Sequence, residues 1–193
     1  MAIGRLLRSS ATGFVFGCAV PEADVPLFGE FVIAPAQRGS TDVIGLVYDI
    51  IIEDDMFVRQ MIATPNLDEV YIQDQRQNRQ VPIEVSVLSL GYRVGTTWTQ
   101  ALPPQPPITL DQIKLCSFEE VQTFTERFDY LKLILDSRNA PVDELIAVAL
   151  RRAANQRAPN EQRRFLRDAG RELARLLSRD LIRLENLLRR IKP

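Results

Sequence analysis

Arginines near the end of the chain recur at steps of three or four residues, a spacing that could bind a row of anionic groups. They are Arg164, Arg167, Arg171, Arg175, Arg179 and Arg183. On a helix this spacing forms a slowly drifting ridge, because 3.6 residues make one turn. Each guanidinium offers a planar fork of donors that suits phosphates and carboxylates. The ridge therefore predicts a solvated or subunit-facing helix, a site for an acidic protein, or a site for nucleic acid.

Two features of this ridge disfavour nucleic acid. Acidic residues lie three or four positions from the arginines and would form local pairs with them: Asp168, Glu172, Asp180 and Glu185. In addition, the ridge contains no aromatic residue on which an unpaired base could stack. A solvated or subunit-facing helix is therefore the first expectation for the ridge, an acidic protein partner the second, and nucleic-acid binding stays an alternative.

The composition offers little for catalysis. The chain has no histidine, which removes the commonest metal ligand and the side chain that most readily exchanges protons near neutral pH. The neighbouring carboxylates Asp54-Asp55 and Asp68-Glu69 diverge on a strand or a helix, so we expect solvated charges there. None of the nine glycines precedes a lysine, as a phosphate-binding loop requires. We therefore predict no catalytic residue, no metal site and no cofactor.

The first half of the chain carries the pattern of short strands. Apolar residues run or alternate over 3–7, 14–20, 30–33, 43–52 and 83–87. Turn-forming residues separate them at 9–13, 21–26 and 37–40. Short strands with frequent turns predict a small closed barrel or a sandwich. Residues 53–80 interrupt the pattern and are expected to be an insertion holding short helices near Phe57 and after Pro65.

After a proline-rich exit at 103–107 the period changes to that of helices. Ser117-x-x-Glu120 is a capping box, and the apolar residues after it predict one helix through Leu131. Asn139-Ala140-Pro141 predicts the start of another helix. Pro159 begins a third that we expect to run as one long basic amphipathic helix to about Ile191.

The long helix has an apolar stripe opposite its arginines, which predicts packing on the body of the protein or on a partner helix. Its candidate packing residues are Leu166, Leu173, Leu177, Leu181, Leu184 and Leu188. The steps include runs of four, so the period is that of a straight helix more than of a regular coiled coil. Whether the stripe covers this chain or another one stays open.

The N-terminal part resembles the HAS-barrel family in three segments: Ile3-Gly4-Arg5, the stretch 26–32, and 43–47 after the Gly39-Ser40 turn. That barrel is found at the N-terminus of HerA-type DNA translocases and is related to the crown domain of rotary ATP synthase subunits. The resemblance covers roughly the first 120 residues. It implies a barrel used for ring assembly and for docking a partner nuclease, here without the ATPase core.

Composition and charge add a few limits. A composition with 46% hydrophobic and 25% charged residues is that of an ordinary folded protein, and no segment approaches the roughly 20 apolar residues of a membrane span. Two cysteines are too few for a disulfide framework, so we expect a reducing cytoplasm. Net charge is −5 over 1–110, −4 over 111–150 and +8 over 151–193. A basic end on an acidic body favours a negative partner or a second copy.

Taken together, these features predict an α+β chain. A HAS-like β-barrel would occupy 1–108, with its insertion at about 53–80, and an α-helical region would occupy 109–193. The expected function is that of a non-catalytic adaptor that docks on a hexameric ATPase or a DNA-processing complex. The partner would be a protein, an ATPase or a nuclease by resemblance, and homo-oligomerisation is possible. Nucleic-acid binding through the arginine ridge is the alternative function.

Overall fold

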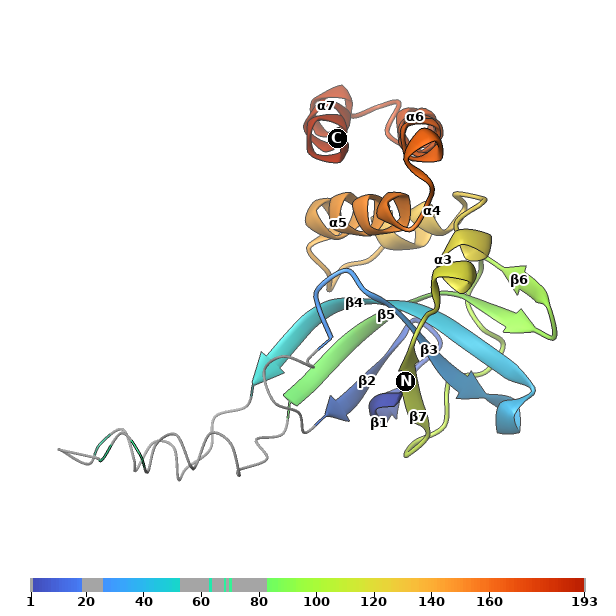
Figure 1. Ribbon diagram of the computed structural model, residues 1–193, viewed down its shortest axis with the longest axis vertical. Helices are drawn as coiled ribbons and strands as arrows, with labels where there is room; N and C mark the ends of the chain where they lie inside the picture. Colours follow the sequence, from blue (N-terminus) through green and yellow to red (C-terminus); the bar gives the residue numbers. More distant parts are fainter. Residues whose placement is uncertain are drawn as a thin grey trace.

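The computed structural model describes residues 2–18, 26–52 and 83–192, together with Ala63, Asp68 and Val70. A β-barrel comes first and five helices follow it, which confirms the α+β class (Figure 1). The expected helices within the insertion at 53–80 and the pair Asp54-Asp55 lie outside the described residues.

Six strands close the barrel. They are β1 (Ala2–Ser9), β2 (Gly13–Cys18), β3 (Phe31–Ala36), β4 (Thr41–Ile52), β5 (Ile83–Val94) and β7 (Gln112–Leu115). Every neighbour is antiparallel in the order β1-β7-β3-β4-β5-β2, and β2 pairs with β1 again to complete the circle. β6 (Thr97–Thr99) pairs only with β5, as a hairpin beyond the barrel. Closure leaves the six strands without a free edge.

The last barrel strand, β7, lies beyond residue 108, where we placed the end of the barrel. It pairs with β1 and β3 and supplies the buried Ile113. Its four residues carry a single buried side chain, which is too short a pattern to indicate a strand from sequence. Helices therefore begin after residue 117 in the structure.

Apolar side chains fill the barrel interior. One buried cluster gathers there from all six strands: Ile3, Leu6, Phe14, Phe16, Cys18, Val32, Ala34, Ala36, Val43, Val47, Ile83, Val85, Val87 and Ile113. Alternate residues of β3, β4 and β5 point outward instead and join a second buried cluster with the helices, as Phe31, Leu46 and Leu90 do. These three strands are thus apolar on both faces, because one face meets the barrel core and the other meets helices.

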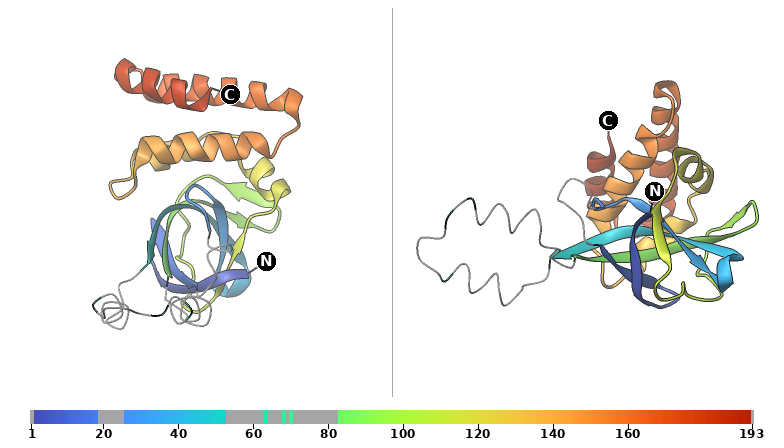
Figure 2. Two further views of the ribbon diagram at one scale, coloured as in Figure 1. Left: turned by 60° about the vertical axis from the view of Figure 1, so that its left-hand side comes forward. Right: turned by 60° about the horizontal axis from the view of Figure 1, so that its bottom comes forward.

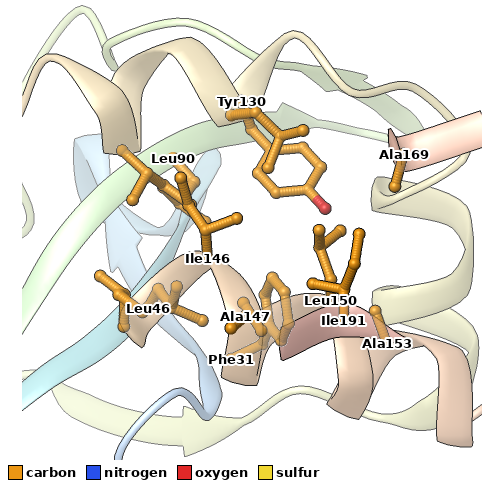
Figure 3. Close-up of a cluster of buried hydrophobic side chains, with 14 of the residues drawn as sticks. Phe31, Leu46, Leu90, Tyr130, Ile146, Ala147, Leu150, Ala153, Ala169 and Ile191 are labelled. Atoms are coloured by element: carbon orange, nitrogen blue, oxygen red, sulfur yellow. The ribbon is translucent and has the colours of Figure 1, made fainter. Parts of the chain in front are cut away.

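The helices form two layers over this wall of the barrel (Figures 1 and 2). α3 (Phe118–Phe124), α4 (Tyr130–Leu135) and α5 (Val142–Asn155) belong to the inner layer, and α6 (Pro159–Leu176) and α7 (Leu181–Ile191) lie outside α5. The buried cluster runs without a break from the strands through α5 to α6 and α7 (Figure 3). The barrel and the helices therefore share one hydrophobic core.

The predicted helix from Ser117 to Leu131 is two helices, so that prediction was wrong in its extent. The capping box is confirmed: Ser117 and Glu120 bond each other's backbone amides. α3 nevertheless ends at Phe124, since Gln100 donates to the carbonyls of Phe124 and Arg127 and accepts from the amide of Tyr130. A side chain distant in sequence thus bonds the backbone groups that the turn between α3 and α4 leaves unpaired.

The prediction of a single long helix from Pro159 to about Ile191 was also wrong. The chain leaves α6 after Leu176 and starts α7 at Leu181, with Asp180 as the N-cap that accepts from the amide of Arg183. Aspartate at this position stabilises a new helix start. The break returns α7 against α5 and α6, so that short helices bury leucines that one straight helix would leave exposed.

Arg93 ties the first helix to the barrel. From β5 it bonds Asp42 on β4 at 2.6 Å and Glu120 on α3 at 3.0 Å, and it stacks on Trp98 of β6 with its guanidinium carbon 4.8 Å from the ring centre. Both carboxylates favour the charged guanidinium, Asp42 most strongly through its hydrogen bond, so the pKa of Arg93 is raised.

Tyr130 gives a prediction about stability. Its side chain is fully buried in the shared core, its hydroxyl has no hydrogen-bond partner among the described residues, and burial raises its pKa (Figure 3). An unsatisfied buried hydroxyl destabilises a protein. We expect Tyr130→Phe to raise the free energy of unfolding by about 1 kcal/mol in urea denaturation. A lower stability would show that the hydroxyl has a partner in the folded protein.

Candidate interaction surface

Four of the six predicted arginines lie together on α6, and we call them the arginine face: Arg164, Arg167, Arg171 and Arg175. All four are exposed. Because steps of three and four residues return to the same side of a helix, they form one row opposite the buried Leu166 and Leu173. Arg179 follows in the exposed turn between α6 and α7. The row is therefore available for a contact with another molecule.

The ion pairs of this face are local and weak. Asp168 lies 3.1 Å from Arg171 and 3.9 Å from Arg164, and Glu172 accepts from Arg175 at 2.6 Å. The hydrogen bond from Arg175 lowers the pKa of Glu172. Exposed pairs of this kind contribute little to stability, about 0–1 kcal/mol each. They can rearrange at small cost when a charged partner approaches.

Arg167 has no ion pair among the described residues, and the same holds for Arg179. Their exposed guanidinium groups keep all their donors in water, so they are the most accessible cations of the row. The interleaved carboxylates Asp168 and Glu172 give the face two signs of charge. A surface of alternating charge complements a protein better than it complements a uniformly negative phosphate backbone.

Arg183 has a different place. It lies on α7 and bonds Asp143 of α5 at 2.7 Å, and Arg190 on the same helix bonds Glu144. These pairs fasten α7 to the start of α5. The structure therefore separates Arg183 from the arginine face and gives it a contact inside the chain.

The leucine stripe is largely used within the chain. Leu166, Leu173 and Leu177 are buried, and Leu184 and Leu188 are partly buried against the same core. Leu181 differs, because it is 69% exposed at the start of α7. Leu187 is fully buried although the stripe did not include it, since the break before α7 changes which side faces inward. Most of the stripe is thus unavailable for pairing with a partner helix.

The described part of the chain offers little else for chemistry. There, no group of three or more cysteine, aspartate and glutamate side chains is arranged to hold a metal ion. Cys18 is a buried residue and Cys116 is partly buried, and the burial of each thiol raises its pKa. No described helix is long and apolar enough to cross a membrane.

No family model matches the chain, and no curated protein resembles it significantly in sequence. The function is therefore inferred from the surface of the molecule and from its own residues.

Proposed function

We propose that this protein is a non-catalytic assembly or adaptor module, and that the arginine face of α6 docks on an acidic surface of a partner protein. One observation carries the proposal. The leucine side of α6 is buried inside the molecule, while its arginine side stays exposed and only locally paired. A helix anchored in this way presents its cations on a rigid support, which lowers the entropy that binding costs.

The packed barrel supports a scaffolding role. In the described part of the barrel, aliphatic and aromatic side chains occupy the interior and leave no central chamber for a substrate. Arg93 and the shared core hold the helical layers in a fixed position on the barrel. The barrel thereby acts as a rigid base for the surface that α6 presents.

The class of partner is part of the proposal. The resemblance to the barrel of HerA-type translocases favours a hexameric ATPase or a nuclease of a DNA-processing complex. The mixed charge of the arginine face favours a protein over DNA or RNA, because Asp168 and Glu172 would lie against phosphates of the same sign. A mainly acidic partner surface that also carries basic side chains opposite Asp168 and Glu172 would satisfy both signs.

Affinity capture tests this function. The tagged full-length chain is used to capture partners from lysate of its native cells, with and without nuclease, and the purified chain is examined by light scattering. We expect a stoichiometric protein partner that nuclease treatment leaves bound and that 0.5 M salt, roughly a 4 Å screening length, releases. Recovery of nucleic acid alone would overturn the proposal, and so would partners that are lost with nuclease.

A further inference from the structure

A pocket of about 580 Å³ opens between the barrel and the loop that joins α4 to α5. Its volume lies within the range of roughly 300–1,000 Å³ that is typical of sites for small molecules. Its lining includes the turn between β1 and β2 and the loop 136–139. The pocket thus lies where the barrel meets the helices, and no residue of the arginine face lines it.

The floor of the pocket is apolar. It is formed by Val15, Tyr48 and Leu88 of the barrel strands, by Leu133 of α4 and by Leu102 of the loop after β6. Leu102 is 44% exposed there, and Tyr48 is partly buried against the shared core. Covering this floor with an apolar group would remove its surface from water, which favours binding.

The rim is polar and rich in donors. Ser10 and Thr12 lie on the hairpin side, where the Ser10 hydroxyl donates to the carbonyl of Gly13 at 3.1 Å and accepts from the Thr12 hydroxyl at 3.1 Å. On the loop side, Arg138 and Asn139 are exposed, and Arg138 has no ion pair among the described residues. These groups offer several hydrogen-bond donors around one apolar floor.

The charge of the pocket is positive. Arg8 and Arg138 line it, and its one acidic residue is Asp136, whose carboxylate already accepts from Lys132 at 2.6 Å. Arg8 is held in place by a bidentate bond to Glu84, with atoms 2.7 and 3.3 Å apart. Arg138 is therefore the cation best placed to receive an anion from solution.

We infer that this pocket binds an amphipathic organic anion, that is, an apolar or aromatic body on the floor with a carboxylate or phosphate bonded to Arg138. The side-chain amide of Asn139 adds a neutral donor beside Arg138. This site is separate from the arginine face, so the inference does not depend on the proposed adaptor function.

Nuclear magnetic resonance of the full chain labelled with ¹⁵N tests the site with three probes: 4-phenylbutyrate, the uncharged 4-phenylbutanol and the short anion butyrate. We expect 4-phenylbutyrate to shift the amides of 10–13 and 137–139 and to bind at least tenfold more tightly than either control probe. An equal affinity for the alcohol would contradict recognition of the anion, and an equal affinity for butyrate would contradict binding of an apolar body on the floor.

Variants sharpen this test. Arg138→Ala is expected to lower the affinity for 4-phenylbutyrate at least fivefold. Arg138→Lys should lower this affinity about half as much, because lysine keeps the charge without the planar fork. Arg151→Ala, an exposed arginine on α5, serves as the control and should bind as the wild type does. Unchanged binding by Arg138→Ala, or shifts confined to residues outside the pocket, would overturn the inference.

Discussion

Reversing the charge at Arg167, Arg171 and Arg175 to glutamate is expected to lower capture of the protein partner at least 100-fold. Such a loss corresponds to about 2.7 kcal/mol. The physical reason is that three attractive contacts become repulsive, and like charges across an interface cost several kcal/mol. The measurement is the amount of partner recovered from nuclease-treated lysate at fixed bait concentration.

The fold should survive these substitutions, because all three side chains are exposed. New like-charge neighbours of Asp168 and Glu172 cost only about 0.2–0.5 kcal/mol per pair. A matched control reverses three exposed cations elsewhere, Arg38, Lys114 and Arg127, which changes the net charge equally. If both triple variants lose the partner to the same extent, net charge and not the arginine face controls binding.

Gly29→Ala is expected to lower the free energy of unfolding by about 2–4 kcal/mol. Gly29 precedes β3 with φ at +76°, which favours glycine, and a Cβ atom there would lie 2.5 Å from a methyl carbon of Val148 on α5. The substitution therefore adds backbone strain and pushes α5 from the barrel. Urea denaturation followed by circular dichroism measures the change.

Gly39→Ala measures the strain part of this effect alone, so the difference between the two variants gives the packing part. Its φ is +83°, close to that of Gly29, but no atom lies within 4 Å of the position of a new Cβ. We expect it to cost only the strain of the left-handed conformation, about 1–2 kcal/mol. Equal losses for the two variants would mean that α5 does not press on the turn at Gly29.

The strands of the barrel could be predicted from sequence because their buried positions appear as runs or alternations of apolar residues. The expected segments at 3–7, 14–20, 30–33, 43–52 and 83–87 all fall on strands of the barrel or overlap them. The strand β7 carries no such pattern, since its only buried side chain is Ile113. It becomes a strand through pairing with β1 and β3, which are distant in sequence.

The helix boundaries depended on contacts that sequence does not display. Gln100 ends α3 by bonding backbone groups more than twenty residues away. The apolar period continued through Leu177 and Leu181, so it concealed the break that Asp180 caps. Aspartate before an apolar run is a start signal that could have been recognised, although the same residue is common within exposed helix faces.

The candidate surface was predictable in its charges and only partly in its geometry. The spacing from Arg164 to Arg175 correctly indicated residues that share one side of a helix. Arg183 left the row because the chain turns before α7 and brings it to Asp143. Arg138 was not singled out at all, since its place beside the hairpin at Ser10 follows from the tertiary fold.

Site-specific photo-crosslinking from the arginine face is the most direct test of the central claim. A benzophenone amino acid is placed at Ala174, which is exposed on α6 beside Arg171 and Arg175, and a second variant carries it at Lys114 on the barrel. We predict that irradiation in native cells attaches one protein to position 174, that nuclease leaves this adduct intact, and that position 114 gives none. A nucleic-acid adduct at 174, or a protein attached only at 114, would contradict the account.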